Sequence, residues 1–135
     1  MRALAAAGLL AASAASAASA GPPPIAESFG FRTPSGNIVC ASGRLVGGRS
    51  GAGLLCVVFS ASDARGQKTW YVRRTGRAGV RFVQSNIRTE RLATIAYGRS
   101  WSRLGFVCTS RRAGLTCRNR SGHGFFLSRE SQRRF

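Results

Sequence analysis

His123 and four acidic residues, Glu27, Asp63, Glu90 and Glu130, are the side chains of this 135-residue sequence that could carry acid–base chemistry. A single histidine excludes ribonuclease chemistry that uses two histidines. It leaves a nuclease of the Glu-His-Arg kind, in which Glu90 is the base and His123 is the acid.

Other hydrolytic chemistries have less support. Asp63 and His123 could belong to a Ser-His-Asp triad, but the sequence has no G-x-S-x-G elbow. Glycoside hydrolysis needs two neighbouring carboxylates, whereas the four acids are scattered. With one histidine and few carboxylates, we expect no metal and no cofactor.

His123 lies between two glycines, in Gly122-His123-Gly124-Phe125, which reads as a turn entering a strand. The competing interpretation is a turn histidine that hydrogen-bonds nearby backbone. The sequence therefore favours a protein without catalytic residues and keeps the nuclease with His123 and Glu90 as the alternative.

The four cysteines form two close pairs, Cys40 with Cys56 and Cys108 with Cys117. Eight residues separate the second pair, and this even number lets its cysteines face each other across a two- or four-residue hairpin loop. Fifteen residues separate the first pair, which implies an odd-length loop or a bulge. Of three possible pairings we choose Cys40–Cys56 and Cys108–Cys117. A four-cysteine zinc site would need closer C-x2-4-C spacings.

The first twenty residues have the features of a signal peptide with an N-terminal helix. Arg2 supplies a positive charge, residues 3–12 are apolar, and Ala18-Ser19-Ala20 is a cleavage site. The apolar run is about half the ~20 residues of a membrane span, and no later segment is apolar enough to cross a bilayer. We expect an exported protein, secreted or periplasmic, and such proteins carry disulfides.

Four segments describe the expected domain organisation. Residues 1–20 form the signal peptide, 21–28 a proline-rich lead-in, 29–128 a single β domain, and 129–135 a basic tail that is frayed. We expect a monomer.

Short apolar runs separated by turn residues predict an all-β fold, a small disulfide-stapled sandwich or barrel of about 7–9 short strands. Alternation would turn Phe106, Cys108, Leu115 and Cys117 towards the core. The expected strands lie near residues 36–41, 54–59, 69–72, 80–83, 92–97, 106–109, 115–117 and 125–127.

The charge favours anionic partners. The sequence has 21 basic and 4 acidic residues, a net charge of +17, and Lys68 is its only lysine. Nucleic acid, lipopolysaccharide, acidic polysaccharide and anionic membrane all fit such a charge. A GC-rich genome is the competing explanation for the arginines.

Aromatic residues and arginines are interleaved in two stretches, Trp70–Arg74 and Arg99–Arg103. Aromatic rings could stack on bases or sugars while guanidinium groups hold phosphate or sulfate. The competing interpretation places both tryptophans in the core. The candidate binding residues are Trp70, Arg73, Arg99, Trp101, Arg103, Arg111, Arg112, Arg118 and His123.

Three stretches together resemble a family of small exported bacterial proteins of unknown function. They are Phe31–Cys40 (FRTPSGNIVC), Tyr97–Trp101 (YGRSW) leading into Phe106–Cys108 (FVC), and Leu115–Asn119 (LTCRN) with Gly122–Phe125 (GHGF). The resemblance implies a secreted or periplasmic bacterial β domain with paired cysteines, and it brings no catalytic residue.

Three function classes follow from the sequence. The favoured one is a non-enzymatic module that binds an anionic polymer or envelope component. The others are a small basic hydrolase of the nuclease kind and an inhibitor or accessory of another exported protein.

Overall fold

The structure is a computed structural model in which residues 8, 29–43, 52–84 and 92–135 are described. The expected signal peptide and its helix, apart from Gly8, lie outside the described residues, as does the proline-rich lead-in. The alternative catalytic residue Glu90 also lies outside them.

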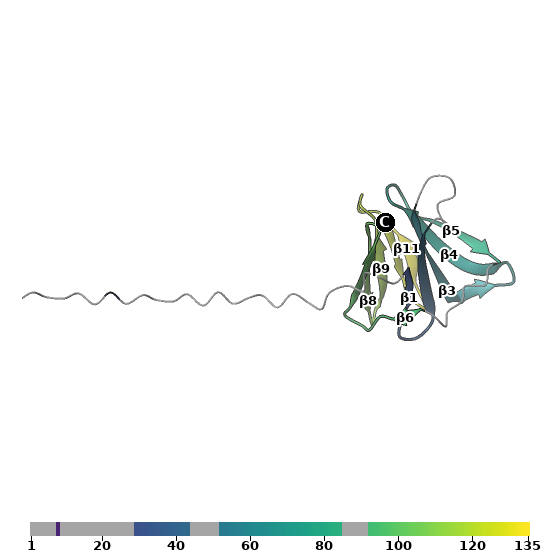
Figure 1. Ribbon diagram of the computed structural model, residues 1–135. Helices are drawn as coiled ribbons and strands as arrows, with labels where there is room; N and C mark the ends of the chain where they lie inside the picture. Colours follow the sequence, from purple (N-terminus) through teal and green to yellow (C-terminus); the bar gives the residue numbers. More distant parts are fainter. Residues whose placement is uncertain (1–7, 9–28, 44–51, 85–91) are drawn as a thin grey trace, which may run out of the picture.

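Eleven strands in two sheets make up the described chain, which confirms the all-β prediction (Figure 1). The strands exceed the expected 7–9 because β1, β7 and β11, which lie outside the expected ranges, have only three or four residues each, too few to show a clear alternating pattern. The strands are β1 (Gly30–Arg32), β2 (Ile38–Gly43), β3 (Gly53–Asp63), β4 (Gly66–Arg73), β5 (Gly79–Val83), β6 (Ala93–Thr94), β7 (Ser100–Arg103), β8 (Phe106–Arg111), β9 (Gly114–Arg118), β10 (Gly124–Leu127) and β11 (Gln132–Arg134).

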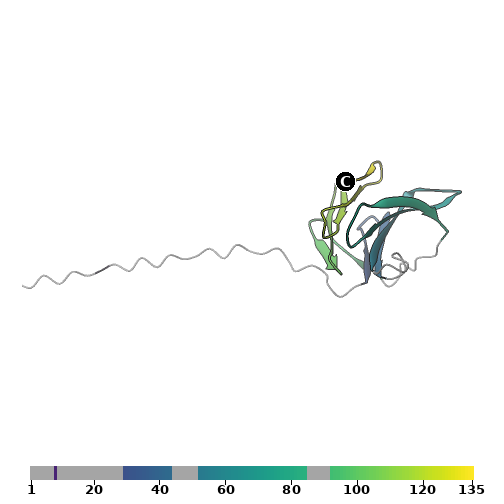
Figure 2. The same cartoon turned by 90° about the horizontal axis from the view of Figure 1, so that it is seen from above.

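The two sheets pack face to face as a sandwich (Figures 1 and 2). One has six strands in the order β5-β4-β3-β2-β1-β6, and the other has five in the order β11-β10-β9-β8-β7. Neighbouring strands are antiparallel except β1 and β6, which are parallel. No helix of the described residues is long and apolar enough to cross a membrane.

Two disulfides lie at the centre of the core, one in each sheet. Cys40 faces Cys56 between β2 and β3, and Cys108 faces Cys117 between β8 and β9, with Cα–Cα distances of 4.1 Å in both. This is the pairing that the spacing favoured. The β8–β9 connection is a two-residue loop, because Arg111 pairs with Gly114.

The inward faces agree with the alternation in the sequence. Phe106 and Leu115 are fully buried beside the disulfide of their hairpin, and Phe31 of β1 packs on Trp101 of β7 with ring centroids 5.1 Å apart. Burial of this continuous apolar layer stabilises the sandwich by roughly 25 cal/mol per Å² removed from water.

The expectation of a frayed C-terminal tail is wrong for residues 132–134. They form β11, which pairs with β10 from Leu127↔Gln132 to Phe125↔Arg134. Lys68 of β4 donates a 2.9 Å hydrogen bond to Gln132 and so links β11 to the opposite sheet. Arginines in this segment hid the strand, because they lie on an exposed edge where no apolar alternation is needed.

A candidate anion-binding cleft

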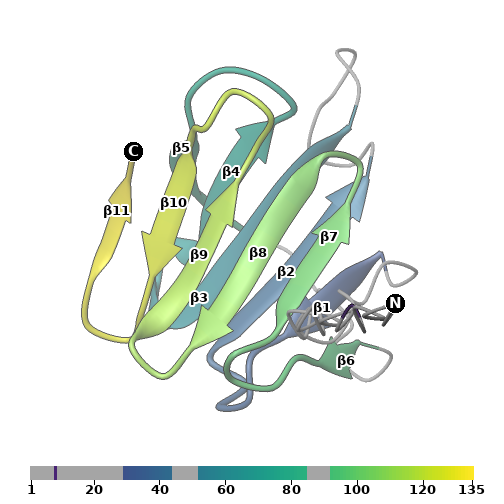
Figure 3. The ribbon, with the colours of Figure 1, turned by 90° about the vertical axis from the view of Figure 1, so that its left-hand side faces the viewer.

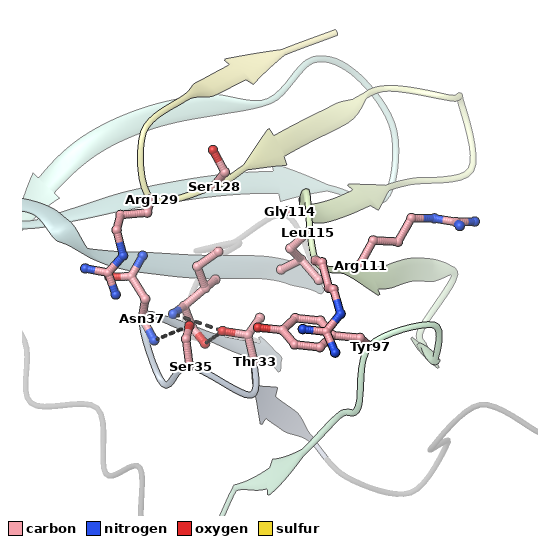
Figure 4. Close-up of a pocket in the computed structure, with 11 residues that line it drawn as sticks. Thr33, Ser35, Asn37, Tyr97, Arg111, Gly114, Leu115, Ser128 and Arg129 are labelled. Atoms are coloured by element: carbon pink, nitrogen blue, oxygen red, sulfur yellow. Dashed lines mark hydrogen bonds between the residues drawn. The ribbon is translucent and has the colours of Figure 1, made fainter.

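A cleft of about 170 Å³ opens at one end of the sandwich, where four turns and segments meet (Figure 4). They are the β1–β2 turn, the segment before β7, the β8–β9 turn and the β10–β11 turn. The residues that line it are Thr33, Ser35, Asn37, Ile38, Tyr97, Arg111, Arg112, Gly114, Leu115, Ser128 and Arg129.

The β1–β2 turn supplies the polar floor of the cleft. Gly36, whose φ of +72° favours glycine, donates its N–H to the carbonyl of Thr33 at 2.9 Å and closes the turn. The Asn37 side chain makes two hydrogen bonds to Ser60. Its amide nitrogen donates to the Ser60 hydroxyl at 3.1 Å, and its oxygen accepts from the backbone N–H of Ser60 at 2.9 Å. These bonds fix the turn before any ligand arrives.

Arginines supply the charge of the cleft. The guanidinium of Arg112 lies 5.0 Å from the ring centre of Tyr97, a cation–π contact on a ring that is 40% exposed. Arg129 lies beside Asn37, while the side chain of Arg111 extends away from the other labelled residues along the rim (Figure 4). In the described part of the chain, none of the three arginines forms an ion pair.

Carboxylates are absent from the lining of this cleft. Of the four acids, the structure describes Asp63 and Glu130. Asp63 forms a 2.6 Å ion pair with Arg65, and the hydrogen bonds from Arg65 hold the pKa of Asp63 below its ordinary value. Glu130 is exposed in the β10–β11 turn. Among the described residues, the lining of the cleft therefore carries arginines and no acidic side chain, and Glu130 follows Arg129 in the same turn.

The structure separates the residues that the sequence proposed for binding into distinct places. Arg111 and Arg112 line the cleft, and the exposed Arg99 follows Tyr97 at the same end. Arg73 and Arg118 are exposed at the opposite end, with the half-buried His123. Arg103 instead donates to the hydroxyl of Ser42 at 2.8 Å and joins β7 to the other sheet.

The two tryptophans are not surface platforms. Trp101 is fully buried and Trp70 is 6% exposed, where it packs against Phe125 at 6.2 Å. The prediction that they stack on a ligand is wrong, because alternation turns both towards the core between the sheets. The competing interpretation of core tryptophans is the one that the structure supports.

Sequence reasoning missed most of the cleft. The sequence leaves Thr33 and Ser35 before the expected strand at 36–41, puts Asn37 in that strand and assigns Arg129 to the tail, all without a binding role. The available signal was the coincidence of turn residues with arginines in Thr33–Asn37, Tyr97–Arg99 and Arg111–Gly114. The meeting of these turns depends on strand order, which the sequence does not reveal.

His123 lies at the end opposite the cleft and has mainly backbone partners. The backbone N–H of His123 donates to the side-chain oxygen of Asn119 at 3.1 Å, and its ring Nδ1 lies 3.4 Å from the main-chain oxygen of Phe135. Of the described acids, Asp63 ends β3 and Glu130 lies in the β10–β11 turn, both at the other end of the strands. The described residues thus bring no acidic side chain to His123.

The sulfur atoms of Cys40, Cys56 and Cys117 lie within 4.8 Å of one another. All three cysteines are in disulfides, so they offer no thiolate to a metal ion. Their closeness reflects contact between the two disulfides across the core.

Comparisons with known proteins give a match over part of the chain. The profile of a family of unknown function (DUF6636) matches residues 72–135, slightly under half of the sequence. This range includes Tyr97, the arginines of the cleft and the whole five-stranded sheet, but not the β1–β2 turn. Comparison with curated proteins and with solved structures gave no match. Over these residues, the chain is similar to a family of unknown function.

Proposed function

We propose that this protein is an exported, non-enzymatic module that binds an anionic polysaccharide or other anionic envelope polymer at the cleft. The observation that carries the proposal is that Arg111, Arg112 and Arg129 line one cleft with hydroxyl and amide side chains, and that no carboxylate is among the lining residues. Guanidinium groups make two parallel hydrogen bonds to sulfate, phosphate or carboxylate, and neutral hydroxyls suit sugar oxygens.

The size of the cleft favours a polymer over a free small ligand. Its volume of about 170 Å³ is below the ~300–1,000 Å³ of pockets that enclose a drug-sized molecule. One charged sugar unit would occupy the cleft while neighbouring units contact the rim, along which the Arg111 side chain extends.

The burial of both tryptophans favours a polysaccharide over a nucleic acid. Binding of single-stranded nucleic acid relies on aromatic rings that stack successive bases. At the cleft the described exposed aromatic ring is Tyr97, and Arg112 already lies against it. No described acidic side chain lies beside His123, so no observation favours the nuclease alternative.

Binding to heparin, a sulfated polysaccharide, tests the proposal, with lipopolysaccharide and RNA measured alongside. We expect heparin or lipopolysaccharide to bind more tightly than RNA. Three arginine contacts predict a loss of affinity of roughly 40-fold between about 50 and 200 mM salt, by the rule for phosphate contacts. The cleft variant R111Q/R112Q/R129Q should bind heparin more weakly and with a smaller salt dependence.

The matched control is R32Q/R81Q/R133Q, which removes the same charge from β1, β5 and β11 at residues that do not line the cleft. An equal loss of heparin affinity in the two triple variants would mean that net charge alone attracts the polymer. It would overturn the proposal that the cleft is the binding site. If the protein instead bound another exported protein with an affinity that does not depend on salt, the inhibitor or accessory alternative would be favoured.

Export is tested by intact mass. The mature protein should lack residues 1–20 and, with both disulfides formed, should gain four hydrogens on reduction. A cell-associated protein that retains residues 1–20 would overturn export.

A further inference from the structure

A second group of cations lies at the end of the sandwich opposite the cleft. Figure 3 shows the β9–β10 connection and the β4–β5 connection together at this end, with the β8–β9 and β10–β11 turns at the other. The group comprises Arg73, Arg74, Arg77, Arg118, Arg120 and His123.

Hydrogen bonds join the two connections into one frame. Asn119, 5% exposed, donates its amide N–H groups to the carbonyls of Arg73 at 2.9 Å and Gly76 at 2.8 Å. The N–H of Arg120 donates to the carbonyl of Arg74 at 3.3 Å. Arginines that are far apart in the sequence are therefore held side by side.

The Asn119 oxygen completes the frame from the other side. It accepts hydrogen bonds from the N–H and the hydroxyl of Ser121, both at 3.0 Å, and from the N–H of His123 at 3.1 Å. Both amide donors and the oxygen are thus used in shaping the surface. A surface fixed before binding loses less conformational freedom when a ligand arrives.

No described acidic side chain lies among these cations. Asp63 at the end of β3 and Glu130 in the β10–β11 turn both lie towards the cleft end. All five arginines of the group are exposed. Crowded like charges raise the energy of the folded protein, and an anionic partner lowers it.

The two ends are too far apart for one sugar unit to contact both. A strand of eight residues such as β4 is roughly 26 Å long. Two basic ends separated by the length of the strands can hold two different polymer segments, or two different chains, at once.

We propose that this second group is a separate polyanion-binding surface and that the protein bridges two anionic polysaccharide chains, one at each end. The bridging rests on the proposed function of the cleft, whereas the second surface stands on its own residues. The ligand class is the same, a polymer carrying sulfate, phosphate or carboxylate groups.

A two-step capture measures bridging. Heparin fixed to a surface captures the oxidised protein, and fluorescent heparin is then added. We expect the unaltered protein to hold both heparins. The loop variant R74Q/R77Q/R120Q should still bind the fixed heparin through the cleft but lose the fluorescent signal at least ~10-fold, as a binder with one site.

The outcomes separate the two proposals. The cleft variant R111Q/R112Q/R129Q should also bind one heparin and lose bridging, and R32Q/R81Q/R133Q should retain bridging. Full bridging by the loop variant would overturn the proposed second binding surface without affecting the proposal for the cleft. Loss of all binding in the loop variant, with normal binding in the cleft variant, would overturn the cleft and the bridging while leaving the second surface.

Discussion

Two buried asparagines set the geometry of the two basic ends. Asn37 fixes the β1–β2 turn at the cleft through Ser60, and Asn119 fixes the opposite end through Arg73, Gly76, Ser121 and His123. An asparagine suits this role because one side chain both donates and accepts hydrogen bonds. The arginines provide the charge, while the hydrogen bonds of these two amides fix the turns that carry it.

Replacing Asn119 by alanine should destabilise the protein by roughly 2–4 kcal/mol, because two carbonyls, two N–H groups and one hydroxyl lose their partner. Urea unfolding of the oxidised protein measures the change. Ser121→Ala is the control, since Ser121 is exposed and its loss should cost about 1 kcal/mol or less. Equal stability of Asn119→Ala and the parent would contradict the role given to the amide.

Replacing Arg65 by glutamine should raise the pKa of Asp63 back towards its ordinary value of 3.8, because Arg65 hydrogen bonds now lower it. A lowered folded pKa stabilises the protein above the unfolded pKa, and this contribution disappears as the pH falls through the folded pKa. Both side chains are exposed, so stability at neutral pH should hardly change. NMR titration of Asp63 in the parent and in Arg65→Gln measures the change in pKa. An unchanged pKa would contradict the ion pair between Asp63 and Arg65.

At the scale of elements, stapled hairpins form the centre of each sheet. Cys40 and Cys56 join β2 to β3, Cys108 and Cys117 join β8 to β9, and all four are fully buried. Each hairpin thus brings a covalent cross-link and an apolar face to the same place. The sheets then pack through these faces.

Removing the disulfide of β8–β9 by Cys108→Ala with Cys117→Ala should cost about 3 kcal/mol in chain entropy, before any loss of packing. Urea denaturation compared with the parent measures it. The buried disulfides should also resist a mild reductant until the protein unfolds. Rapid reduction of both disulfides under native conditions would contradict their burial.

Replacing Gly124 by alanine should disrupt β10, because a Cβ at this position would overlap the carbonyl oxygen of Cys117 on β9. We expect a loss above ~3 kcal/mol or failure to fold. Gly122→Ala is the matched control: its φ of +80° disfavours alanine, but no atom lies within 4 Å of its Cβ. It should cost about 1 kcal/mol, and thermal unfolding ranks the two variants.

At the scale of the whole molecule, charge opposes folding and favours association. The net charge of +17 creates self-repulsion that an anionic ligand relieves. Cations gathered at two opposite ends direct this attraction to two places rather than one.

Heparin should therefore raise the melting temperature at low salt, since a ligand that binds the folded state stabilises it by mass action. The rise should disappear in about 1 M salt, where the screening length falls to ~3 Å. Differential scanning calorimetry measures it. In a variant that lacks both arginine groups the rise should vanish even at low salt, and an undiminished rise would contradict this account.

The sequence by itself determined the features that depend on near neighbours along the chain. Alternation gave the inward faces around the cysteines, and the number of intervening residues gave a pairing within each hairpin. These could be predicted because a strand repeats every two residues and a hairpin loop fixes its own register.

Only the tertiary structure decided which turns meet. Thr33, Tyr97, Arg112 and Arg129 come together because of strand order and sheet packing, and no local pattern encodes that order. The same packing buried Trp101 and paired β11 with β10. Contacts between residues distant in the chain are settled by the lowest free energy of the whole fold, and so the two basic ends appeared only in three dimensions.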